Sequence, residues 1–152
     1  MDVKKQTGDA AKRMLSELEG LPLSMARKLD PCELYELLFG NSYVNYEEAP
    51  NGTQEKRVHF EFCIHGQCDV RIGEERLTGW STDGELQRAL RGFLGTAVEE
   101  AALGAGNVLR LRFPAGTIEF CPIPDRDEAR RLFSQDRTRA HLVMRRDGYD
   151  FE

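Results

Sequence analysis

Hydrophobic and polar residues alternate most regularly between residues 58 and 72. The apolar positions of this stretch are Val58, Phe60, Phe62, Ile64, Cys68, Val70 and Ile72. A period of two is typical of strands with one buried and one solvated face, so the pattern predicts two antiparallel strands joined by a loop at residues 65–67. If both apolar sets share a face, Phe62 must lie opposite Val70.

Four other segments have the features of short helices. Apolar residues recur at helical spacing over residues 9–19, just before Gly20. The other three segments begin with a capping box, in which a side-chain acceptor is followed three residues later by a glutamate. These boxes are Asp30 with Glu33, Thr82 with Glu85, and Asp125 with Glu128. They predict one helix ending before Gly40, one ending before Gly95, and a last one that contains Phe133.

Further segments favour strands. Residues 42–47 are rich in β-favouring side chains and precede a turn-forming stretch at residues 49–55. Apolar residues alternate on both sides of a turn at residues 114–117, which predicts a hairpin, and the same pattern predicts a final hairpin over residues 142–151. Residues 96–103 fit either the continuation of a helix or a strand.

These elements predict an α+β fold in which antiparallel β-hairpins pack with three to four short helices. A chain of 152 residues has the size of one domain, so residues 1–152 are expected to share one core. Residues 30–73 and 82–121 repeat an order of helix, strand and hairpin, and a C-terminal helix and hairpin follow over residues 125–151. The repeat suggests an internal duplication, and chance recurrence of a common arrangement is the alternative.

Composition and charge narrow the functional classes. The net charge of −5 disfavours a nucleic-acid-binding protein, which usually carries a basic surface. No apolar run approaches the roughly 20 residues that cross a bilayer, and residues 1–12 are polar, so we expect a cytoplasmic protein without a membrane segment. The four scattered cysteines do not resemble the framework of a secreted disulfide-rich domain.

The best candidates for chemistry are His59, Cys63 and His65, which share the polar positions of one predicted strand. Thiolate and imidazole are good zinc ligands, but a structural zinc site needs four ligands, and the predicted register turns Cys68 towards the core. Successive polar positions lie about 7 Å apart along a strand, too far for a nucleophile–base hydrogen bond. We therefore predict no catalytic residue, no metal and no cofactor. A small enzyme or metal-binding domain on the His59/Cys63/His65 face is the alternative.

Charged residues are unevenly distributed along the chain. Residues 30–61 contain seven acids and two bases, whereas residues 126–146 contain seven arginines and three acids. Two such segments can attract each other, or one of them can steer a partner.

The sequence favours a non-enzymatic protein-binding module, of the type of small bacterial inhibitor or immunity proteins. Its acidic face would dock on a basic protein partner, and the predicted partner-binding residues are Glu47, Glu48, Glu55 and Glu61. Nucleic-acid contact through the C-terminal arginines is less favoured, because the aromatic residues of a stacking platform are not interleaved with them.

Overall fold

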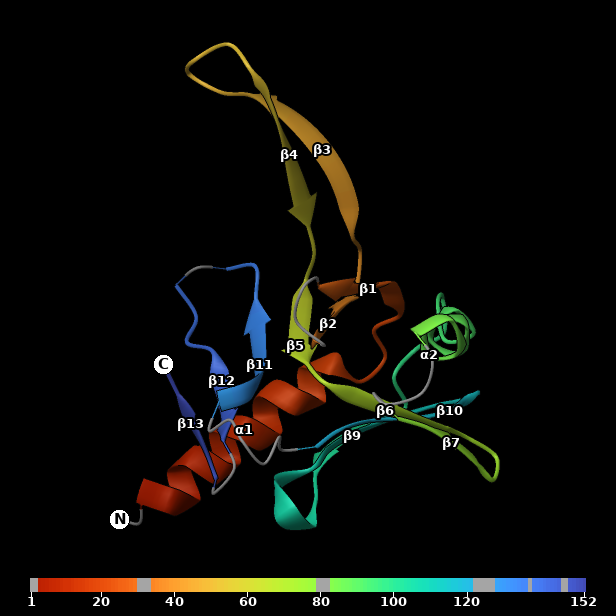
Figure 1. Cartoon of the computed structure of the whole chain (residues 1–152). Helices are drawn as coiled ribbons and strands as arrows, with labels where there is room; N and C mark the ends of the chain where they lie inside the picture. Colours follow the sequence, from red (N-terminus) through yellow and green to blue (C-terminus); the bar gives the residue numbers. More distant parts are fainter. Residues whose placement is uncertain (1–2, 30–33, 79–82, 122–127, 137, 146–147) are drawn as a thin grey trace.

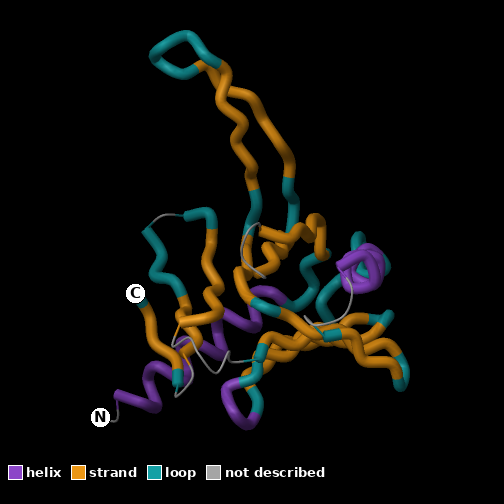
Figure 2. The backbone as a smooth tube through the Cα atoms, in the orientation of Figure 1, coloured by secondary structure: helices purple, strands orange, loops and turns teal. Residues whose placement is uncertain are grey.

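The computed structural model describes residues 3–29, 34–78, 83–121, 128–136, 138–145 and 148–152. Within these ranges strands dominate, and the α-helices are two (Figures 1 and 2). The elements follow in the order α1 (Val3–Leu18), β1 (Leu23–Leu29), β2 (Leu34–Phe39), β3 (Tyr43–Glu48), β4 (Gln54–His59), β5 (Phe62–Gly66), β6 (Cys68–Ile72), β7 (Glu75–Leu77), α2 (Asp83–Arg91), β8 (Glu100–Leu103), the 3-10 helix η1 (Ala105–Asn107), β9 (Leu109–Phe113), β10 (Gly116–Phe120), β11 (Glu128–Ser134), β12 (Leu142–Arg145) and β13 (Tyr149–Phe151).

The strands form two large antiparallel sheets and one separate hairpin. The first sheet has six strands in the order β1-β2-β5-β11-β12-β13, and the second has five in the order β7-β6-β10-β9-β8. The strands β3 and β4 form a two-stranded sheet of their own. Only Gln67 separates β5 from β6, so the chain passes here directly from the first sheet into the second.

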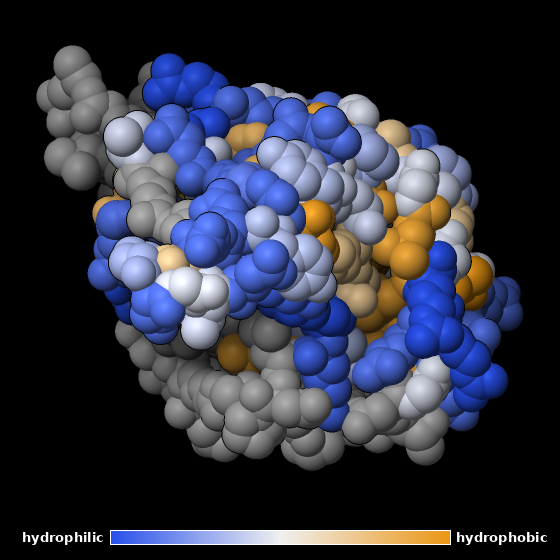
Figure 3. Space-filling view, turned by 90° about the horizontal axis from the view of Figure 1, so that it is seen from above, coloured by the Kyte–Doolittle hydropathy of each residue, from blue (hydrophilic) through white to orange (hydrophobic). Residues whose placement is uncertain are grey.

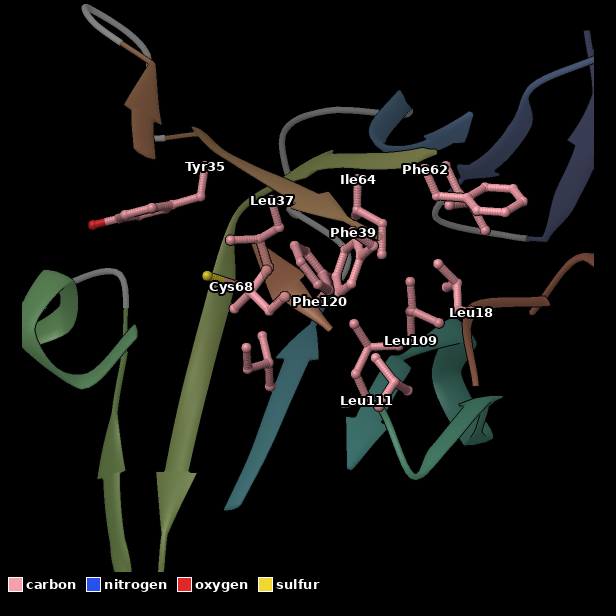
Figure 4. Close-up of a cluster of buried hydrophobic side chains, with 14 of the residues drawn as sticks. Leu18, Tyr35, Leu37, Phe39, Phe62, Ile64, Cys68, Leu109, Leu111 and Phe120 are labelled. Atoms are coloured by element: carbon pink, nitrogen blue, oxygen red, sulfur yellow. The ribbon is translucent and has the colours of Figure 1, made fainter. Parts of the chain in front are cut away.

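The hydrophobic core lies between the two large sheets. Leu37, Phe39 and Ile64 of the first sheet meet Leu109 and Phe120 of the second (Figure 4). The helices add their apolar faces, with Ala11, Met14, Leu15 and Leu18 of α1 and Leu86 and Leu90 of α2 buried in the same cluster. The helices predicted from residue 9 and from residue 82 are thus confirmed, the first beginning earlier, at Val3.

The predicted fold class is wrong in its helix content, because three to four helices were expected and the described residues contain two α-helices. The segment Leu34–Phe39, predicted as helix, is the strand β2, which pairs with β1 and β5. Its apolar residues fit helical spacing, but Tyr35, Leu37 and Phe39 also fit strand spacing and join the core cluster. A short apolar run carries both periods, and pairing on both sides makes it a strand.

The last predicted helix is wrong as well. Its residues form β11, which lies inside the six-stranded sheet between β5 and β12. Arg130 and Leu132 alternate with strand spacing and are both fully buried. Because arginine is normally a surface residue, Arg130 was read as a solvent-facing position, and the period of two along β11 was not recognised. Residues 30–33 and 125–127, which include the predicted caps of these two helices, lie outside the described part of the chain.

The predicted hairpin over residues 58–72 is also wrong. Phe62 pairs with residues of β2 and β11, whereas Val70 pairs with residues of β7 and β10. The even-numbered residues of 62–70 are all buried, so one buried face continues across Gly66, although Cys63 is buried as well. Burial at every second position indicates a path that bends from one sheet into the other, and glycine is common at such bends.

Other predicted strands are confirmed. The segment expected at residues 42–47 is β3, and the two further hairpins are β9–β10 and β12–β13. The ambiguous stretch 96–103 contains the strand β8. The proposed duplication of residues 30–73 and 82–121 stays a hypothesis. The two segments do not begin with the same kind of element, because β2 is a strand whereas α2 is a helix.

Candidate functional site

The hairpin of β3 and β4, here called the arm (residues 43–59), projects from the body of the protein (Figure 1). Its pairing runs from Tyr43 opposite His59 to Glu48 opposite Gln54. The turn beyond these strands is closed by a backbone hydrogen bond from Ala49 to the carbonyl of Thr53, 2.7 Å long. A two-stranded hairpin is only marginally stable in water on its own, so a projecting arm gains stability from any surface that covers it.

The arm exposes large hydrophobic side chains. Tyr43, Val44 and Tyr46 are 54%, 38% and 63% exposed, and only Ile72 and Leu94 join them among the large hydrophobic residues of the described chain. Seen from above, the surface has large hydrophilic areas and a group of hydrophobic residues to the right of the centre (Figure 3). Tyrosine is enriched at protein–protein interfaces, because its ring gives contact area while its hydroxyl can still form a hydrogen bond. The arm therefore has the composition of an interface.

Three of the four predicted partner-binding residues lie on the arm. Glu47 and Glu48 end β3, and Glu55 lies on β4. Glu47 is directly opposite Glu55. Two carboxylates directly opposite each other concentrate negative charge on one face of the arm.

Glu61, the fourth predicted residue, lies where the arm joins the body. Its Oε2 accepts a hydrogen bond from the backbone N–H of Asn41 (2.8 Å). Its own backbone N–H donates to the carbonyl of Phe39 (3.2 Å). Gly40 has a φ of +88°, and a Cβ at this position would collide with the Glu61 carboxylate. Glu61 thus helps to fix the base of the arm.

A pocket of about 580 Å³ lies at the base of the arm, between His59 on one side and Phe133, Gln135 and His141 on the other. The His59 ring stacks on Tyr43 with centroids 4.4 Å apart, and its Nδ1 lies 3.1 Å from the Gln135 side-chain nitrogen. The His59 Nε2 is buried and has no hydrogen-bond partner among the described residues. A pocket of this size can hold a partner side chain or a small ligand.

The three residues singled out for chemistry lie in two places. His59 belongs to the arm, whereas Cys63 and His65 lie on β5 in the six-stranded sheet. Glu36 of β2 lies directly opposite His65, and its Oε2 is 2.9 Å from the His65 Nε2. Arg27 of β1 donates to the other carboxylate oxygen, Oε1, at 2.8 Å. Ligand atoms of Glu36, Cys63 and His65 all lie within 4.8 Å of one another.

Cys63 is poorly suited to nucleophilic chemistry in this setting. Burial raises the pKa of its thiol well above the usual range, and the nearby Glu36 carboxylate raises that pKa further. The thiolate is the reactive form of cysteine, and catalytic cysteines have lowered pKa values. The geometry therefore does not favour a thiol enzyme on the His59/Cys63/His65 residues.

The C-terminal arginines that the structure describes make contacts within the protein. Arg130 is buried, and the ion-pair partners of the others are Glu17 for Arg139, Glu152 for Arg131, and Asp150 with Glu152 for Arg145. These acids belong to α1 and to the C-terminal residues rather than to the acidic segment 30–61. Arg126, Arg137 and Arg146 lie outside the described residues.

Sequence reasoning did not place Glu36 or His141 in a candidate site. Glu36 lies beside His65 because β2 pairs with β5, a pairing that was hidden once the segment was interpreted as a helix. His141 stacks on Phe133 with ring centroids 4.8 Å apart, and this brings it into the pocket at the base of the arm. The alternation of Tyr35, Leu37 and Phe39 is the signal that could have revealed Glu36.

Neither α-helix of the described chain combines the length and the apolar character that crossing a membrane would need. Comparison of the chain with protein-family models, with curated proteins and with solved structures gives no match. Function must therefore be inferred from the residues described above.

Proposed function

We propose that this protein is a non-enzymatic protein-binding module whose arm docks on a basic protein partner. The observation that carries the proposal is the projecting hairpin, with Tyr43 and Tyr46 exposed and Glu47 opposite Glu55. An inhibitor or immunity-type role fits this shape, because a narrow arm can enter and fill a groove of its partner. The proposed compartment is the cytoplasm, where the free thiols of Cys63, Cys68 and Cys121 would stay reduced.

The aromatic residues supply the contact energy in this proposal. Covering Tyr43 and Tyr46 removes apolar surface from water, and each buried tyrosine can also form a hydrogen bond through its hydroxyl group. The pocket at the base of the arm adds a place for one side chain of the partner. Together these features give the arm exposed aromatic side chains along β3 and a pocket at its base.

The acidic residues determine which partner is favoured. A lysine or arginine of the partner would pair with the carboxylates of Glu47 and Glu55, which lie on the same face of the arm. Complementary charge also speeds the encounter of two proteins. A basic partner surface is therefore favoured over a neutral or acidic one.

The proposal is tested by capturing the partner from the native cell with the full-length chain, then measuring association kinetics at two salt concentrations. The double substitution Glu47→Lys with Glu55→Lys should slow association severalfold and flatten its salt dependence, because steering acts mainly on the association rate. Folding should change little, since the two positions keep like charges opposite each other and exposed charges contribute about 0–1 kcal/mol per pair.

The matched control is Glu74→Lys with Glu75→Lys. These acids are exposed at the turn between β6 and β7, so the control changes the net charge equally at a second hairpin. Its association rate should stay close to that of the unmodified protein. An acidic partner, or equal slowing of both double variants, would contradict the proposal.

A further inference from the structure

Glu36, Cys63 and His65 bring three metal-ligating atoms together within the six-stranded sheet. Cys63 and His65 are two residues apart on β5 and therefore point to the same face. Glu36 of β2 is the cross-strand neighbour of His65, which adds a carboxylate to that face. Two neighbouring strands thus direct a thiol, an imidazole and a carboxylate at one point.

The spacing of these atoms fits a zinc ion. Zinc–ligand bonds of about 2.0–2.3 Å in a tetrahedral arrangement place the ligand atoms roughly 3.3–3.6 Å apart. Glu36 Oε2 and His65 Nε2 are 2.9 Å apart, and the whole set lies within 4.8 Å, so small side-chain rotations are sufficient. Mg²⁺ and Ca²⁺ prefer oxygen ligands, whereas zinc accepts sulfur, nitrogen and oxygen together.

The surroundings hold the ligands in position. Both β2 and β5 are interior strands of the sheet, which gives the ligands a rigid backbone. Arg27 donates to Glu36 Oε1 and leaves Oε2 directed at His65. Groups that orient a ligand in this way commonly strengthen metal binding. The His65 side chain is 34% exposed, so an ion can reach the site from solvent.

We propose that Glu36, Cys63 and His65 bind one Zn²⁺ ion, with water as the fourth ligand. Cys63 loses its thiol proton to solvent and binds through Sγ, His65 binds as a neutral imidazole through Nε2, and Glu36 binds through Oε2. The Glu36–His65 hydrogen bond is replaced by two metal–ligand bonds, and no electron is transferred.

The charge of the ion explains how a buried thiol can serve as a ligand. A coordinated divalent cation deprotonates a thiol outright, which overcomes the opposite effect of burial on Cys63. Three protein ligands and one water leave an exchangeable position for a further ligand. The site is separate from the arm, so its test does not depend on the partner-binding proposal.

The experiment uses the full chain after chelator treatment, titrated with Zn²⁺ by calorimetry and with Co²⁺ by absorption spectroscopy. We expect one ion per chain and a thiolate-to-cobalt charge-transfer band. Cys63→Ser should abolish the band, and His65→Gln should weaken Zn²⁺ binding at least about tenfold, since even outer groups that orient ligands contribute about 10- to 100-fold. His65 is partly exposed, so its variant tests the site even if Cys63→Ser fails to fold.

Two controls match the ligand types. Cys121→Ser removes a partly buried thiol and His59→Gln removes an imidazole, both outside the three-residue set. Each should keep the Zn²⁺ affinity and the cobalt band of the unmodified protein. The proposal is overturned if the unmodified chain gives no charge-transfer band, or if His65→Gln binds Zn²⁺ as tightly as the unmodified chain.

Discussion

Replacing Arg130 with lysine should lower the free energy of unfolding by about 2–4 kcal/mol. The guanidinium of this buried side chain donates hydrogen bonds to the backbone carbonyls of Asn107, Phe120 and Arg145. One side chain of the six-stranded sheet therefore connects β12 with β10 of the other sheet and with the 3-10 helix η1. Lysine keeps the charge but lacks the planar fork, so carbonyls lose their donor while the charge stays buried.

Urea unfolding of the two proteins measures this effect. Burial already lowers the pKa of Arg130 to about 10, which leaves the guanidinium charged at neutral pH and dependent on its three acceptors. The variant should show a lower midpoint with an unchanged slope. Arg112→Lys, at an exposed position of β9, should stay within about 0.5 kcal/mol of the unmodified protein. Equal midpoints for the two variants would show that Arg130 does not join the sheets.

Tyr46→Ala should weaken binding of the partner about 30-fold, which corresponds to roughly 2 kcal/mol. Tyr46 is the most exposed large hydrophobic residue described, and tyrosine is among the residues that dominate binding energy at interfaces. The loss should appear mainly in the dissociation rate, because contact residues act there more than on association. Folding should change little, since the side chain is 63% exposed in the free protein.

Ile72→Ala is the matched control for Tyr46→Ala. Ile72 is 39% exposed and lies next to the β6–β7 turn, so its substitution removes an exposed hydrophobic side chain from a different hairpin. Its partner affinity should equal that of the unmodified protein. Unchanged affinity of Tyr46→Ala would show that the aromatic residues of the arm are not the anchor.

Sequence patterns predicted the strands that have one buried and one solvated face. The clean alternation of Leu109–Phe113, buried at every second residue, led to the correct hairpin. The strands β2 and β11 were missed because neither has such faces: Leu38 is buried although Leu37 and Phe39 face the core cluster, and Arg130 is polar although it points inward. Strands enclosed on both sides give runs that also fit a helix.

Strand partners were harder to predict than strand faces. Alternation correctly assigned Phe62 and Val70 to buried positions, yet it could not show that they belong to different sheets. The meeting of Glu36 with His65 depends on a pairing that no local pattern indicates. The acidic residues of the arm could be read from the sequence. That they project away from the body could not, because the sequence does not show that the hairpin extends beyond the two large sheets (Figure 1).

The central claim is that the arm, rather than the body, binds the partner. Replacing residues 45–57 with Asn-Gly joins the paired Val44 and Val58 through a short turn and leaves both large sheets unchanged. Circular dichroism and urea unfolding first establish that this variant is folded. The decisive measurement is then its affinity for the captured partner by calorimetry. The account predicts much weaker binding by the folded variant, which keeps Tyr43 and the pocket but lacks Tyr46, Glu47 and Glu55. An affinity equal to that of the unmodified protein would contradict it.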